Sequence, residues 1–582
     1  MRSPAEIRFR LRQEFENLRL FAMPPHWDEP LTGPLPGLPD PEGTAAALRA
    51  SKDYCAEIER LATDALAHRF HLLGLKPVDL GDPIRWRRDF LHGQETGLDY
   101  FRRIPYLDFA RAGDHKVIWE LNRHQHLVIL AQAFLLTGRR EFLDEIPRQL
   151  DHWISENPTH RGVNWTSALE VAFRALSWLC VLHLVGRHFS EDFRRRWMSS
   201  LNHHGLHLEY NLSVYFSPNT HLLGEAVVLD ELGVLLPQMP HSAQWRKLGT
   251  ATVQEEMRRQ VREDGSHFEQ STYYHAYALE FFEFHASLHP DTPTWYGDKL
   301  QKMDAYRDAF VSSKGLMPLI GDEDGGRLFH PYGDRRTFGV RRPEESAWWF
   351  NNELPRSIPT RSELFKDAGL AVLRSGRAHV IFDVGQFGAL SSGHSHADTL
   401  SIVAFVDGEE LLIDAGTFTY ISDPEARQRF RGTAAHNTIS IGSLEQAEPK
   451  GPFRWVNLPE IKLLRWDSNE KCDIVDAQCS YRGFTHRRTV TFEKPEKLIV
   501  VDHVTGPTGQ HTVEQRWLTP ADVCLHIASK PEPCVEPAER STALGSREPA
   551  QRWIVRFEGP LRATISSTIE LRRDDAPTKW RQ

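Results

Sequence analysis

The sequence has few cysteines and no apolar run that we expect to span a membrane. Its 582 residues include six cysteines, none of them arranged as a CxxC pair. In a chain of this length scattered cysteines need not pair, so we expect free thiols. The N-terminal segment is charged throughout and lacks the apolar core of a secretory signal, and we expect no later run to be long enough to span a membrane. These absences predict a cytoplasmic protein with no membrane partner; a periplasmic location is the alternative.

A strong excess of charge is also lacking. The net charge of −9 is modest for this length and argues against nucleic acid as a dedicated ligand. A local basic patch can still bind an anionic substrate. The hydrophobic content of 40% and the charged content of 26% are typical of a globular protein, and the length predicts two or more domains.

The hydrophobic periodicity divides the chain into two parts. Helical spacing recurs through residues 1–360 with short loops, which is typical of stacked helical hairpins such as an α/α toroid. From residue 361 to residue 582 short β-rich runs alternate with turns, and Asp407-Gly408 between two apolar runs indicates a tight hairpin. We therefore predict an α + β multidomain chain, a helical toroid followed by an antiparallel β-sandwich. The proline-containing segment 351–363 is the expected junction.

Two motifs of the helical part carry candidate chemistry. In "SPNTHLLGEA", Asn219 and His221 lie at the start of a helix, where backbone N–H groups attract a carboxylate. The alternative is that Asn219 only caps the helix. In "DGSHFEQSTYYHAYALEFF", Tyr273 or Tyr274 could transfer a proton if a positive group lies nearby, but aromatic residues at this spacing also form cores.

A third motif combines histidines with a carboxylate in the second part. His394 and His396 stand in a Ser/Gly-rich loop, and Asp414 and His436 follow in "DAG" and "AAHNTISIG". Two imidazoles and one carboxylate are a plausible zinc set, although lone histidines are usually not ligands. The tight hairpin would place Asp414 opposite residues near Ser401, so the loop before Asp398 would have to fold back.

A fourth motif, "KVIWELNRHQHL", contains Arg123. Pairing with Glu120 and Glu170 between helices is the simplest account of this arginine, and binding of an anionic sugar is the alternative.

Together, these motifs resemble the heparinase II/III-like family of polysaccharide lyases. The resemblance covers most of the chain and rests on six stretches in the same order: "WELNRHQHL", "NWTSALEVAFRALSW", "SPNTHLLGEA", "DGSHFEQSTYYH", "GHSHADTLSIVAFVDGEELLIDAGTFTY" and "RFRGTAAHNTISIG". It implies an incomplete α/α toroid followed by an antiparallel β-sandwich. It also implies β-elimination on a uronic-acid-containing polysaccharide, which would be the partner of this protein.

The resemblance also implies residue roles. Asn219 and His221 would neutralise the uronate carboxylate, and Tyr274, which precedes His275, and His394 would transfer protons. His396, Asp414 and His436 would hold a mainly structural zinc ion. Further candidates for substrate binding are Arg123, Tyr420 and Arg431.

Two other classes of function stay open. A glycoside hydrolase on the same toroid would need a pair of carboxylates, and none stands out. A non-catalytic or assembly-related protein that binds acidic glycan would serve a surface polysaccharide pathway. The polymer is also open, with heparan sulfate, alginate, hyaluronan and bacterial exopolysaccharides as candidates, and so is a homodimer.

Overall fold

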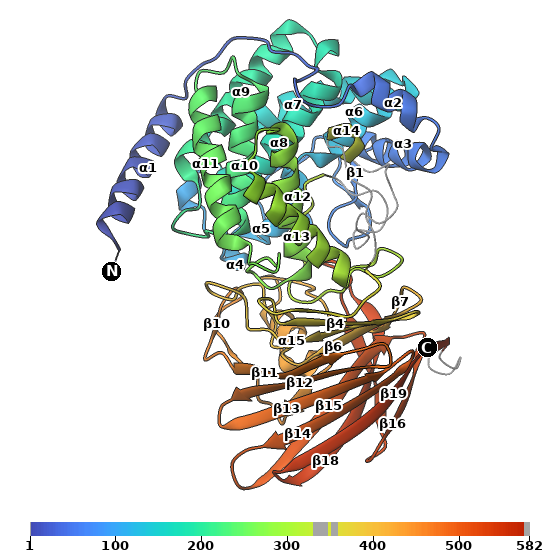
Figure 1. Ribbon diagram of the computed structural model, residues 1–582. Helices are drawn as coiled ribbons and strands as arrows, with labels where there is room; N and C mark the ends of the chain where they lie inside the picture. The colour runs from blue at the N-terminus through green and yellow to red at the C-terminus, as the bar shows by residue number, and fades with distance from the viewer. Residues whose placement is uncertain (1, 330–346, 351–358, 576–582) are drawn as a thin grey trace.

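The computed structural model describes residues 2–329, 347–350 and 359–575, and it shows a helical part followed by a part made of strands (Figure 1). The helices of the first part are α1 (Pro4–Ala22), α2 (Pro41–Leu48), α3 (Lys52–Leu66), α4 (Phe109–Ala112), α5 (His115–Asn122), α6 (Gln125–Thr137), α7 (Arg140–Glu156), α8 (Ala168–Val185), α9 (Glu191–Asn211), α10 (Thr220–Leu235), α11 (Ser242–Gln260), α12 (Thr272–Leu288), α13 (Thr294–Phe310) and α14 (Ala347–Phe350). This order confirms the predicted α + β architecture.

Helix α8 is the centre of the helical part. Every one of its residues is buried, because its apolar side chains contact neighbouring helices on all sides. The stretch Ala168–His188, which contains α8, is long and apolar enough to cross a membrane, contrary to the expectation from the sequence. The most apolar 18 residues of this stretch are all buried inside the protein, as in the core helix of a globular fold. Residues Arg69–Phe70 and Val78–Asp79 form a two-stranded ladder, β1 and β2, within this part.

The strands of the second part form three larger antiparallel sheets. One has the order β3-β4-β5-β6-β7, one the order β11-β12-β13-β14-β19-β16, and one the order β17-β18-β15-β8. Their bounds are β3 (Glu363–Phe365), β4 (Leu370–Ser375), β5 (Ala378–Asp383), β6 (Ile402–Val406), β7 (Glu409–Leu412), β8 (Ile439–Ile441), β11 (Glu460–Ser468), β12 (Cys472–Tyr481), β13 (Phe484–Glu493), β14 (Lys497–Thr505), β15 (Gln510–Pro520), β16 (Val523–Ser529), β17 (Cys534–Arg540), β18 (Glu548–Pro560) and β19 (Ala563–Asp575). A short ladder pairs β9 (Glu448–Pro449) with β10 (Trp455–Val456), and α15 (Pro424–Arg431) precedes β8.

The predicted hairpin at Asp407-Gly408 is confirmed. Val406 of β6 pairs with Glu409 of β7, so the two intervening residues form the turn, and both have a positive φ. The predicted junction at 351–363 lies mostly outside the described residues, and the boundary at residue 360 stays a prediction. The last described helix of the first part ends at Phe350, and the first strand of the second part begins at Glu363.

The helical part and the first sheet share a core. Tyr273 of α12 and Phe310 of α13 belong to one buried apolar cluster with Val372 of β4 and Ile381 of β5. Figure 1 shows α13 directly above this sheet. Shared burial of this kind fixes the two parts relative to each other, so a site between them can hold a precise geometry.

Two adjacent arginines on β13 provide a stability test. Arg488 is fully buried, donates to both carboxylate oxygens of Asp502 at 2.7 and 2.9 Å and to the carbonyls of Leu400 and Asn437, each at 2.7 Å. We expect Arg488→Met to lower the free energy of unfolding by about 3–5 kcal/mol, because it removes the guanidinium that offsets the charge of the buried Asp502 carboxylate. The midpoint of urea unfolding measures this loss.

Arg487 is the matched control, since its side chain is half exposed where it pairs with Asp476, so solvent can reach this ion pair. Arg487→Met should cost no more than about 1 kcal/mol. Equal losses in the two variants would contradict this account of the sandwich core.

Candidate active site

A cavity of about 490 Å³ lies where the ends of several helices meet loops of the strand part. The predicted residues among those that line it are Asn219, His221, Tyr274, His394 and Tyr420. They come from the starts of α10 and α12 and from two loops of the second part. The fold therefore brings together residues that the sequence separates by some 200 positions.

Tyr274, His394 and Tyr420 form a compact group on one wall of this cavity. The rings of Tyr274 and His394 stack with centroids 3.9 Å apart, and the hydroxyls of Tyr274 and Tyr420 lie 3.2 Å apart. Ser271 caps α12 by accepting a hydrogen bond from the Tyr274 N–H at 3.2 Å, which fixes the first turn. Tyr273 points instead into the shared core, so packing decides which of the two adjacent tyrosines reaches the cavity.

A buried carboxylate holds His394 in place. Asp322, which is fully buried, lies 3.1 Å from Nδ1 of His394 and 3.0 Å from Nε2 of His396. Arg427 of α15 donates to both of its oxygens. Burial alone would raise the pKa of Asp322, but the Arg427 guanidinium and the histidine hydrogen bonds hold this pKa well below its usual range. The carboxylate therefore stays ionised.

The opposite ring nitrogen of His394 faces a second carboxylate. Its Nε2 lies 3.6 Å from Oε1 of Glu269. Burial disfavours the charged imidazole, yet Asp322 and Glu269 outweigh burial and raise the pKa of His394 above its ordinary value. His394 is thus a basic imidazole with one nitrogen hydrogen-bonded and the other directed toward the cavity.

The start of α10 already binds a carboxylate of the chain itself. Asn219 accepts a hydrogen bond from the His221 N–H at 3.1 Å, so it does cap the helix. Its Nδ2 donates to Oε1 of Glu269 at 2.8 Å, and the Thr220 N–H donates to Oε2 at 3.3 Å. Glu269 therefore orients Asn219 while the side chain of His221 stays on the cavity wall.

Burial keeps His221 neutral. Removal of the imidazole from water, together with the nearby charge of His394, lowers the pKa of His221 to about 4. Because this pKa is so low, the protonation state of His221 does not change near neutral pH. The neutral imidazole can donate one hydrogen bond and accept another.

The sequence interpretation missed several polar residues of the site. Asp324 lies on the cavity and pairs with Lys116 of α5 at 3.1 Å. Asp322 and Asp324 come from "GDEDGG", where acidic residues between glycines signal a loop and give no hint of burial. Arg427 stands in α15 four residues before the predicted Arg431, and only its contact with Asp322 distinguishes it.

Two residues predicted to bind substrate lie elsewhere. Arg123 is 1% exposed, donates to both oxygens of Glu170 at 2.6 and 2.8 Å, and does not line the cavity as described. Arg431 is 2% exposed and donates to the carbonyls of Pro452 and Gly451 at 2.8 and 2.7 Å. Both guanidiniums donate to acceptors of the chain itself, so their geometry supports a structural role in place of the predicted contact with sugar.

The three predicted metal ligands lie together beside this network. His396, Asp414 and His436 are buried and offer ligand atoms within 4.8 Å of one another, so the loop does fold back as required. Asp414 lies 2.7 Å from Nδ1 of His436. Within the described chain, Nδ1 of His396 and Nε2 of His436 have no hydrogen-bond partner. Two buried imidazole nitrogens without partners, next to a carboxylate, fit a zinc ion with one further position.

Comparisons with known proteins agree with this architecture. Residues 44–322 match the model "Heparinase II/III N-terminus", and residues 357–581 match "Heparinase II/III-like, C-terminal". A heparin-sulfate lyase of Bacteroides stercoris is 23% identical over 79% of this chain and 73% of its own length. One of Pedobacter heparinus is 23% identical over 68% of this chain and 62% of its own. A crystal structure of heparinase III superposes with a TM-score of 0.66 at 18% identity, covering 90% of this chain and 86% of the other.

The low pKa of His221 has a direct spectroscopic consequence. In protein labelled with ¹³C at the histidine Cε1, we expect the His221 resonance to keep its shift from pH 8 to pH 5 and to move only near pH 4, because burial disfavours the imidazolium. The resonance that disappears in His221→Gln assigns the signal. Titration of that signal near pH 6.5 would show that the imidazole is solvated.

Proposed function

This chain belongs to the heparinase II/III-like family of polysaccharide lyases, and from that membership we propose that it cleaves a uronate-containing glycosaminoglycan by β-elimination. One observation carries the proposal for the mechanism. The stacked pair of Tyr274 and His394, with the Tyr420 hydroxyl beside it, lies on the same cavity as the neutral imidazole of His221. This arrangement offers two proton-transfer groups and a hydrogen-bond donor for a carboxylate.

The chemistry explains why these groups are needed. The proton on C5 of a uronate is weakly acidic, because the carbanion left by its removal can delocalise into the carboxylate. The negative charge of that carboxylate opposes the delocalisation and has to be offset. Hydrogen bonds from His221 and the Asn219 amide would offset it and stabilise the enolate-like intermediate. Glu269 supports this role, since it holds Asn219 at the start of α10.

We assign the base to His394. Asp322 accepts the hydrogen bond of Nδ1, so Nε2 is the nitrogen left to take the C5 proton. The electron pair of the broken C5–H bond forms the C4–C5 double bond as the bond from C4 to the glycosidic oxygen breaks. The proton passes to the solvent when the unsaturated product leaves.

Tyr274 then has the role of the acid. Burial and the negative charge of Asp324 raise the pKa of Tyr274 well above its usual value, so its hydroxyl is protonated before reaction. It can donate that proton to the departing oxygen, and the Tyr420 hydroxyl at 3.2 Å can stabilise the phenolate that forms. The proton is regained from solvent.

The cavity wall also supports an acidic glycan as substrate. Arg10, Arg102 and Lys116 line it, as do the aromatic rings of Tyr215 and Phe216. Cations suit sulfate and carboxylate groups, and exposed rings suit the faces of sugars. The names of the curated relatives favour heparan sulfate as the first polymer to test; alginate, hyaluronan and bacterial exopolysaccharides are the other candidates.

We further propose that His396, Asp414 and His436 hold a zinc ion. Its role when bound would be structural, because it would tie the loop that carries His394 to β8 and to the segment after β7. His396 also contacts Asp322, which in turn holds His394. A bound zinc ion would therefore help to fix the position of this proton-transfer residue. A cytoplasmic location and a homodimer remain further proposals.

The first test replaces Tyr274. With heparan sulfate and the other polymers as substrates, the ultraviolet absorbance of the new double bond should rise with wild-type protein. Tyr274→Phe should reduce that rate by about 10²–10⁴-fold, because the leaving oxygen loses its acid. Tyr273→Phe, in the core beside the cavity, should stay near wild-type activity.

Full activity of Tyr274→Phe would contradict the assignment of the acid. New reducing ends without the absorbance would instead identify a hydrolase, and binding without new ends would identify a glycan-binding protein.

The second test concerns the zinc ion. His436→Ala should lower the zinc content of purified protein by about one equivalent, measured by mass spectrometry of the metal, because a three-ligand site loses one ligand. His503→Ala, which removes an exposed histidine of β14, is the control. Unchanged zinc in His436→Ala would refute the site.

A further inference from the structure

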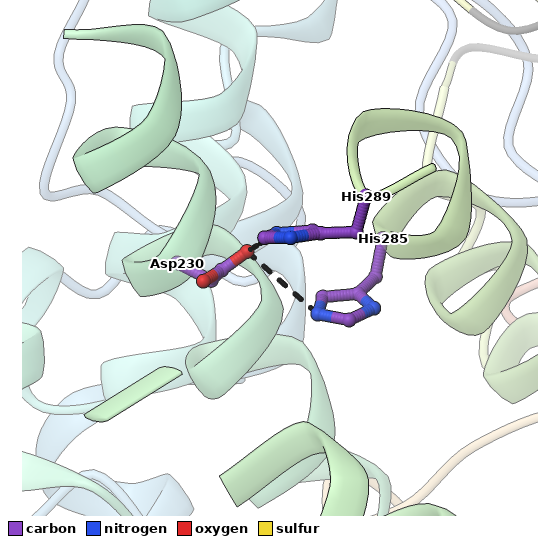
Figure 2. A group of neighbouring side chains, drawn as sticks. All are labelled: Asp230, His285 and His289. Carbon is purple, nitrogen blue, oxygen red and sulfur yellow. Dashed lines mark hydrogen bonds and ion pairs between the residues drawn. The ribbon is translucent and has the colours of Figure 1, made fainter. Parts of the chain in front are cut away.

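A second cluster of histidines and a carboxylate lies inside the helical part, away from the cavity. Asp230 belongs to α10, His285 to α12, and His289 follows the last residue of α12. Figure 2 shows both imidazoles directed at the same carboxylate. The potential ligand atoms of the three residues all lie within 4.8 Å of one another.

The contacts within the cluster leave one imidazole unsatisfied. Nε2 of His289 contacts Oδ2 of Asp230, and Nε2 of His285 lies 3.7 Å from the same oxygen. His285 is fully buried, and in the described chain neither of its nitrogens has a hydrogen-bond partner. A buried polar group without a partner is rare in native proteins and calls for an explanation such as a bound ion.

The carboxylate is oriented from its other side. Thr250 of α11 donates a hydrogen bond of 2.6 Å to Oδ1 of Asp230, which leaves Oδ2 for the two histidines. Helix α11 comes this close because residue 249 is glycine, where a Cβ atom would lie 2.6 Å from the Cβ of Asp230. An oriented carboxylate of this kind is typical of metal ligands, whose outer hydrogen bonds fix their direction.

We propose that Asp230, His285 and His289 bind a divalent transition metal ion, with zinc as the first candidate. Two ligands about 2.0 Å from a tetrahedral zinc ion lie about 3.3 Å apart. The separation of 3.7 Å between His285 and Asp230 is close to this spacing. The closer contact between His289 and Asp230 would open as the ion enters. His289 can move because it follows the helix, and its side chain is 11% exposed, so water can supply a fourth ligand.

The position of the cluster gives the ion a structural role. His221 precedes Asp230 by nine residues on α10, and Tyr274 precedes His285 by eleven on α12. At 1.5 Å per residue the ion would lie roughly 14–17 Å along the two helices from the residues on the cavity. It would join the helices that carry Asn219, His221 and Tyr274 without contacting the substrate.

The experiment compares His289→Gln with wild type. Glutamine can still donate a hydrogen bond to Asp230 but is a poor zinc ligand, so it separates metal binding from hydrogen bonding. Chelator-stripped proteins are incubated with zinc and desalted, and their zinc content is measured. We expect His289→Gln to hold one equivalent less than wild type, and the double variant with His436→Ala to hold one less again.

A matched control is His241→Gln, because His241 is partly exposed and also pairs with a carboxylate, Glu209, at 2.9 Å. It should keep the zinc content of wild type. Zinc should also raise the melting temperature of His436→Ala, and this rise should be absent from the double variant. Equal zinc content in wild type and His289→Gln, or an equal rise in both melting temperatures, would overturn the site. Since this readout does not use activity, it can fail independently of the proposed lyase function.

Discussion

The buried carboxylate of Asp322 is the group on which the active site depends. It belongs to the loop after α13, and its partners His394, His396 and Arg427 come from the second part of the chain. A buried carboxylate is costly unless it is paired and hydrogen-bonded, so the loop and its partners must assemble together. The same contacts stack His394 on Tyr274 and turn His396 toward Asp414 and His436. One ion pair thus links the proton-transfer group, the proposed zinc site and the junction of the two parts.

The surroundings of neighbouring groups in the site shift their pKa values in different directions. His221 and His394 are both largely shielded from water, and desolvation lowers the pKa of His221, whereas Asp322 and Glu269 raise that of His394. Tyr274 stays protonated because its surroundings are apolar or negative. A neutral donor, a base and an acid can therefore operate at one pH, which is the usual reason for such shifts in active sites.

The sequence predicted the parts of the site that local motifs encode. Asn219 and His221 were predicted at a helix start, where they do lie on the cavity, and the three proposed zinc ligands were predicted from histidine spacing combined with the order of the family motifs. Asp322 and Arg427 escaped prediction because their contact joins positions 105 residues apart, and neither stands in a distinctive pattern. Arg123 was open to two interpretations, since burial against Glu170 cannot be seen in a sequence. The fold class was predictable because helical spacing prevails in the first part of the chain and short strand-like runs prevail in the second.

The central claim is that the C5 proton of a uronate is removed to give an enolate-like intermediate, from which the C4–O bond then breaks. The most direct measurement uses an oligosaccharide carrying deuterium at C5 of the uronate, with the products analysed by mass spectrometry. The account predicts an unsaturated product that has lost the deuterium, formed more slowly than from the unlabelled substrate. Cleavage products that retain the deuterium would contradict it.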